Sequence, residues 1–62
     1  MNELRDAVIE YRAKHNITQG EFAEMCKVST PTICNIEKGT AKPSLLTRAK
    51  IYRVIKGEKQ DV

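Results

Sequence analysis

Apolar residues recur at three- and four-residue steps through most of this 62-residue chain, and no stretch alternates between apolar and polar residues. Leu4, Val8 and Tyr11 share one face of a helix expected over about residues 2–14. Asn16 follows this segment, and asparagine is second only to glycine in the left-handed conformation that ends a helix. The pattern predicts an all-α protein whose first helix ends near Asn16.

A second helix is expected directly after Thr18. The Thr18 side chain can cap the helix, and Glu21, three residues later, completes a capping box. Ile17 before the cap can pack against Phe22 as a hydrophobic staple. This helix is expected to turn Phe22 and Cys26 toward the core.

Two further helices begin at serine caps. Ser29 precedes a segment with Pro31 in its first turn, where a missing N–H removes no helical hydrogen bond, and Gly39 ends that segment. Ser44 begins a fourth helix that runs to Gly57. The sequence therefore predicts four helices.

The fourth helix carries more apolar residues than one inward face uses. The expected inward residues are Leu45, Ala49, Tyr52 and Ile55. Leu46 and Val54 are then left toward solvent or a partner, which predicts a homodimer through this helix.

Length and composition limit the class of protein. A chain of 7.0 kDa with 40% hydrophobic residues allows one small globular domain, expected at 1–57, with a polar, disordered tail at 58–62. No apolar run could cross a membrane, and two cysteines indicate a reducing compartment. Most enzymes need a pocket enclosed by more chain than this, so a binding module is expected rather than an enzyme.

Charge is unevenly distributed about a net value of +3. Residues 1–37 hold four basic and six acidic side chains, whereas residues 38–62 hold seven basic and two acidic ones. A basic second half is typical of proteins that bind a polyanion, although solvated helix faces are often basic too.

About three residues separate the second helix from the third, so the two must cross steeply, as in a helix-turn-helix. The segment from Thr18 to Gly39 resembles the phage repressor and Cro type of helix-turn-helix domain, the XRE-like family, and the resemblance covers roughly residues 4–55. The matching residues are Arg12, Gln19, Phe22, Ala23, Val28, Ser29, Ile33, Ile36, Glu37, Gly39, Pro43 and Ser44.

The resemblance implies a compact four-helix, lambda-repressor-like domain that binds double-stranded DNA. This chain departs from the family in three ways. Lys27 stands where the turn usually has glycine, Pro31 offers no long polar side chain to a base, and a fifth helix is expected to be absent.

With Ile33 and Ile36 inward, the third helix (about 29–38) would present its other face to the major groove. The expected base contacts are Thr30, Pro31, Cys34 and Asn35. The expected DNA-backbone contacts are Gln19, Ser29, Lys38, Thr40 and Lys42. Lys38 and Lys42 are alternatively plain solvated charges, and Asn35 an ordinary exposed polar residue.

Arg12 and Glu37 resemble the family's structural ion pair. Catalytic residues, a metal site and a cofactor are not expected, because the single histidine, His15, has no metal-ligand companions, and Cys26 and Cys34 lack a zinc-site spacing. Cys26 is expected to be buried and Cys34 to point outward, where redox sensing stays a minor alternative.

The sequence thus predicts a cytoplasmic, bacterial or phage-encoded transcriptional regulator of the repressor type. It would bind, as a homodimer, an operator with two half-sites. A regulatory protein partner is compatible with this hypothesis, as are antitoxin-like and restriction-control roles. The alternative is a helix-turn-helix fold used as a protein-interaction adaptor.

Overall fold

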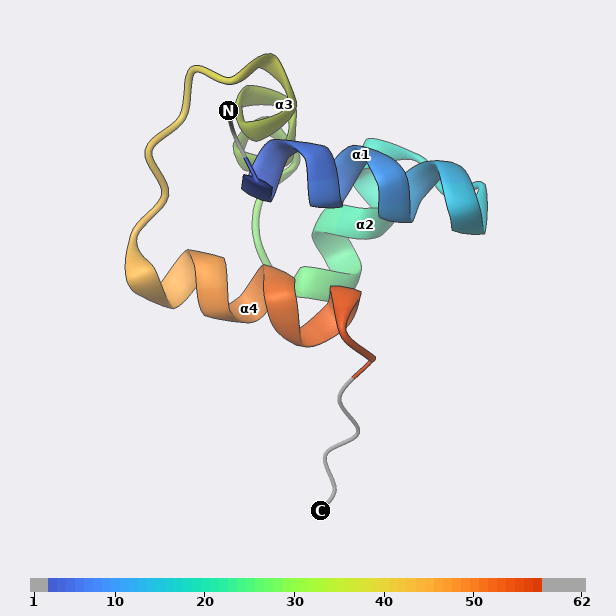
Figure 1. Cartoon of the computed structure of the whole chain (residues 1–62). Coiled ribbons are helices and arrows are strands. Elements are labelled where there is room, and N and C mark those ends of the chain that lie inside the picture. Colours follow the sequence, from blue (N-terminus) through green and yellow to red (C-terminus); the bar gives the residue numbers. More distant parts are fainter. Residues whose placement is uncertain (1–2, 58–62) are drawn as a thin grey trace.

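In a computed structural model, which describes residues 3–57, the expected all-α fold is confirmed (Figure 1). The helices are α1 (Glu3–His15), α2 (Gln19–Cys26), α3 (Thr30–Lys38) and α4 (Leu45–Ile55). No strand occurs in that part of the chain. The polar tail expected at 58–62 lies outside the described residues.

The helix ends lie where the capping pattern predicts them. Thr18 accepts a hydrogen bond from the Glu21 backbone N–H, and the Glu21 side chain accepts one from the Thr18 N–H, so the capping box is complete. The Ser29 and Ser44 side chains cap α3 and α4 by accepting from the backbone N–H groups of Thr32 and Thr47. These caps satisfy N–H groups that have no partner within a helix.

One hydrophobic core joins all four helices. Its buried members are Leu4 and Val8 of α1, Phe22, Ala23 and Cys26 of α2, Ile33 and Ile36 of α3, and Ile51 of α4. α1 and α4 lie on opposite sides of α2 in Figure 1, while the segment between α3 and α4 passes along the edge of the molecule. The core therefore holds α2 and α3 in a fixed crossing.

The inward face expected for α4 is partly wrong. Leu45 is 83% exposed and Ala49 is also exposed, whereas Ile51 is fully buried. Tyr52 and Ile55 do pack against the core, together with Val54, which was expected to point outward. The core contacts the second half of α4, through Ile51, Tyr52, Val54 and Ile55, whereas Leu45 and Leu46 in its first turn remain exposed.

Lys27 adopts the left-handed conformation expected of the turn, with φ 61° and ψ 44°. Its Cβ is crowded in this conformation, which costs about 1–2 kcal/mol, while glycine there loses more chain entropy on folding. We expect Lys27→Gly to raise the free energy of unfolding by about 0.5–1 kcal/mol, and the melting temperature by several degrees.

Thermal unfolding followed by circular dichroism measures this effect. Asn16→Gly is the matched control, since Asn16 is also left-handed (φ 54°) but asparagine tolerates that conformation better, so its gain should be smaller. A Lys27→Gly variant that melts below the parent protein would show that crowding at Lys27 does not limit stability.

Candidate nucleic-acid interface

The surface of α3 is divided into a buried and an exposed face. Ile33 and Ile36 are buried in the core and fix the rotation of the helix about its axis. Thr30, Pro31 and Asn35 are exposed on the other face, with Cys34 half-buried between them. The structure therefore brings the four residues expected to contact bases onto one face of the first two turns of α3.

The N-termini of α2 and α3 lie side by side. A Cβ atom added to Gly20 would lie 3.8 Å from Thr30 Oγ1, so the first turn of α2 lies close to the first residue of α3. Each N-terminus presents backbone N–H groups and the positive end of a helix dipole, and both features favour an anion. The pair of helix ends thus forms a surface suited to a phosphate backbone.

Three of the five residues expected to contact the DNA backbone already bond within the chain: Ser29, Thr40 and Gln19, the last to Glu37. Ser29 Oγ caps α3 by accepting from the Thr32 N–H at 3.3 Å, and it lies 2.7 Å from Thr32 Oγ1. Thr40 Oγ1 donates to the Asn35 carbonyl at 3.3 Å. Lys38 and Lys42 are exposed near the C-terminal end of α3. The two lysines are therefore the better candidates for phosphate contacts.

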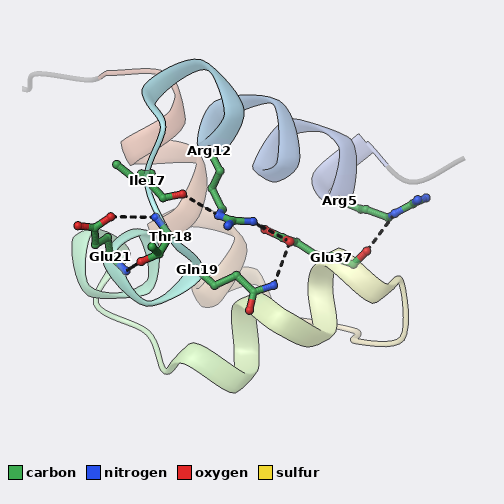
Figure 2. A network of polar contacts seen from close by, with 7 residues as sticks. All are labelled: Arg5, Arg12, Ile17, Thr18, Gln19, Glu21 and Glu37. Atoms are coloured by element: carbon green, nitrogen blue, oxygen red, sulfur yellow. Dashed lines mark hydrogen bonds and ion pairs between the residues drawn. The ribbon is translucent and has the colours of Figure 1, made fainter.

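A half-buried polar network surrounds Glu37 (Figure 2). Arg12 Nη1 lies 2.8 Å from Glu37 Oε2 and 3.0 Å from Oε1, which forms the ion pair anticipated from the resemblance. Gln19 Nε2 donates to Glu37 Oε1 at 3.0 Å, and Arg12 Nε donates to the Ile17 carbonyl at 3.2 Å. The network joins α1, α2 and α3 at a single carboxylate.

This network changes the interpretation of Gln19. Its side chain was expected to bind a phosphate, but its amide donates to Glu37 in the structure. An amide has two N–H donors and one oxygen, so the bond to Glu37 uses only part of its capacity. The bond orients Gln19 at the N-terminus of α2.

Sequence reasoning missed Arg5. Its Nε donates to the Glu37 backbone carbonyl at 3.1 Å, close to the C-terminal end of α3, as Figure 2 shows. Arg5 lies seven residues before Arg12, so both lie on the same face of α1. That spacing is the signal by which Arg5 could have been found.

The two cysteines lie in different surroundings. Cys26 is buried beneath α4, and desolvation raises the pKa of its thiol from 9.0 to about 11. Cys34 is half-buried on α3. Because the thiolate is the reactive form, Cys26 should be inert at neutral pH.

We expect native protein at pH 7.5 to incorporate about one equivalent of iodoacetamide per chain, at Cys34, and denatured protein about two. Mass spectrometry of the alkylated peptides measures both values. A Cys34→Ser variant serves as the control and should alkylate slowly until it unfolds. Labelling of Cys26 in native protein as fast as Cys34 would contradict its burial.

Neither a metal site nor a membrane span is found in the part of the chain described. Among residues 3–57, no three His, Cys, Asp or Glu side chains are grouped so that they could hold a metal ion. None of the four helices is both long and apolar enough to cross a bilayer.

The steep crossing of α2 and α3, with the exposed face of α3 beside the two N-termini, defines a helix-turn-helix protein. The model of the helix-turn-helix family matches residues 8–59. The chain belongs to this family, and the family agrees with the expectation of a binding protein rather than an enzyme.

Curated relatives extend over nearly the whole chain. One from Archaeoglobus fulgidus is 41% identical over 95% of this chain and 83% of its own length. Another from Methanocaldococcus jannaschii is 42% identical over 95% of this chain and 89% of its own. A third from Bacillus subtilis is 34% identical, again over 95% of this chain and 89% of its own. All three are named uncharacterized HTH-type transcriptional regulators. No solved structure matches.

Proposed function

We propose that this protein is a sequence-specific, double-stranded DNA-binding transcriptional regulator that acts in the cytoplasm. The observation that carries the proposal is the exposed row of Thr30, Pro31 and Asn35 on a helix whose opposite face is fixed in the core. A helix with this presentation fits the major groove, where each base pair displays a distinct set of donors and acceptors. The names of the curated relatives support the same function.

Each exposed residue then has a defined chemical role. Asn35 bonds an adenine edge in bidentate fashion, Thr30 donates, accepts or touches a thymine methyl, and Pro31 adds only apolar contact. Cys34, half-buried between them, can touch a base only with its outer surface. Lys38 and Lys42 hold phosphates and fix the register without reading sequence.

We further propose that the protein acts as a repressor and binds as a homodimer to two half-sites. Support for dimerisation comes from the first turn of α4, where Leu45 is 83% exposed. A leucine this exposed gains stability when a second copy covers it. A dimer also doubles the base contacts of so small a domain and requires an operator with two-fold symmetry.

Selection of bound sequences from random duplex DNA, followed by titration of variants, tests this function. We expect one enriched sequence with two half-sites. Asn35→Ala should weaken binding to it by ~1–3 kcal/mol with little effect on random DNA. Lys38→Ala should weaken binding to the selected and the random DNA alike. It should also reduce the slope of log binding constant against log salt concentration by about one unit.

The contrast between Asn35→Ala and Lys38→Ala is the control within this experiment. Equal losses on selected and random DNA would remove Asn35 from base recognition. The absence of any enriched sequence would favour the adaptor or antitoxin-like function instead, for which the exposed Leu45 and Leu46 offer a protein contact.

A further inference from the structure

A groove of about 180 Å³ lies between the C-terminal end of α2 and one side of α4. Its apolar surface includes Met25, which is 46% exposed, Leu46, which is 67% exposed, and Val54. None of these residues belongs to the set expected to contact DNA. The groove is thus an apolar surface that the proposed DNA contacts leave unused.

Three cations border this apolar surface. Lys27, Lys50 and Arg53 line the groove, and no acidic side chain lines it. Within residues 3–57, none of the three forms an ion pair or a side-chain hydrogen bond. Each cation is therefore available to a negatively charged group on whatever covers the groove.

From this charge pattern we propose that the groove binds an acidic amphipathic helix of another protein. Leu46 and Val54 lie eight residues apart, two turns along α4, and Met25 faces them from α2. This spacing suits a helix that inserts apolar residues at i, i+4 and i+7. Acidic residues flanking that apolar face would pair with Lys27, Lys50 and Arg53.

The same features disfavour two other occupants. A second copy docked groove to groove would bring three cations against three, and like charges oppose such a contact. A DNA phosphate backbone would be attracted to the cations but would leave Met25, Leu46 and Val54 without apolar partners. An acidic amphipathic helix satisfies both parts of the surface, and it leaves the exposed face of α3 free for DNA.

A fluorescein-labelled peptide of about 15 residues tests the proposal by fluorescence anisotropy, since helices of this length begin to form in water. It carries leucine at i, i+4 and i+7 and glutamate beside them. We expect a dissociation constant of about 10–100 μM that weakens as salt is raised. Two control peptides, one with the leucines distributed around the helix and one with glutamine for glutamate, should bind at least several-fold more weakly.

Matched charge reversals on α4 locate the contact. Arg53 lines the groove, whereas Arg48 on the same helix is equally basic and exposed but lies outside it. Arg53→Glu should weaken peptide binding about three- to fivefold, and Arg48→Glu should not. A peptide with lysine in place of only the glutamate that faces residue 53 should regain affinity for Arg53→Glu. Met25→Glu should abolish binding of the acidic peptide, and circular dichroism should show that each variant is folded.

Four outcomes would overturn the proposal. The first is equal binding of all three peptides, and the second is equal loss in Arg48→Glu and Arg53→Glu. The third is no peptide binding together with self-association that Arg53→Glu abolishes, which would assign the groove to a second copy. The fourth is a much larger loss of duplex DNA binding in Arg53→Glu than in Arg48→Glu without peptide binding, which would assign it to phosphates.

Discussion

Ile51→Ala is expected to lower the free energy of unfolding by about 3 kcal/mol, because Ile51 is fully buried and its loss leaves a cavity beneath α4. For so small a domain this is a large share of the total stability. Urea denaturation followed by circular dichroism measures the change. The unfolding midpoint should shift to a much lower urea concentration, or the variant should be largely unfolded in buffer without urea.

Leu45→Ala in the same helix provides the control. Leu45 is 83% exposed, so its removal should change the monomer's stability by less than about 0.5 kcal/mol. Comparable losses in the two variants at low protein concentration would show that α4 packs through a different face.

Glu37→Ala is expected to cost about 2 kcal/mol of unfolding free energy. The Glu37 carboxylate accepts hydrogen bonds from Arg12 and Gln19, and its side chain is only 13% exposed, against 25% for Arg12. Its removal leaves a partly buried guanidinium and an amide without their acceptor. The expected loss of unfolding free energy is smaller than for a fully buried ion pair, because water still reaches Arg12.

Thermal and urea unfolding of Glu37→Ala and Glu24→Ala separate this network from a simple change in net charge. Glu24 is an exposed glutamate of α2, so its replacement should change stability by less than about 0.5 kcal/mol. Equal unfolding free energies for Glu37→Ala and Glu24→Ala would mean that the network orients side chains without contributing to stability.

Local features of the fold could be predicted because their causes lie within a few residues. Thr18, Ser29 and Ser44 each cap the N–H group three positions away. Asn16 and Lys27 adopt positive φ where α1 and α2 end. The buried faces of α2 and α3 followed from periodicity for the same reason. These faces and caps are enough to define the helix-turn-helix.

The buried face of α4 could not be predicted in the same way. The α4 residues that contact the core are Ile51, Tyr52, Val54 and Ile55, all in its second half, while Leu45 and Leu46 lie outside the contact. Helical periodicity therefore favoured an inward face that is correct at Tyr52 and Ile55 but wrong at Leu45 and Ala49. The buried side of α4 depends on the path of the segment that connects it to α3. That path is a property of the tertiary structure.

The candidate site shows the same division. Residues on the exposed face of α3 followed from the buried positions of Ile33 and Ile36. The bond from Gln19 to Glu37 and the bond from Arg5 to the Glu37 carbonyl join residues 18 and 32 positions apart. The seven-residue spacing from Arg12 places Arg5 on the correct face of α1, but the acceptors of both bonds depend on how the helices pack.

The hydrogen bonds accepted by the Asn35 backbone carbonyl have a consequence for how a mismatched base pair would affect DNA binding. It accepts hydrogen bonds from the N–H groups of Thr40 and Ala41 and from the Thr40 hydroxyl. The residue proposed to read a base is thus tied to the segment that leads to Lys42. If a mismatched base displaced Asn35, the shift would be transmitted along this segment to the proposed phosphate contact of Lys42. One wrong base pair would then weaken two interactions together, so base discrimination and backbone affinity would vary jointly rather than independently.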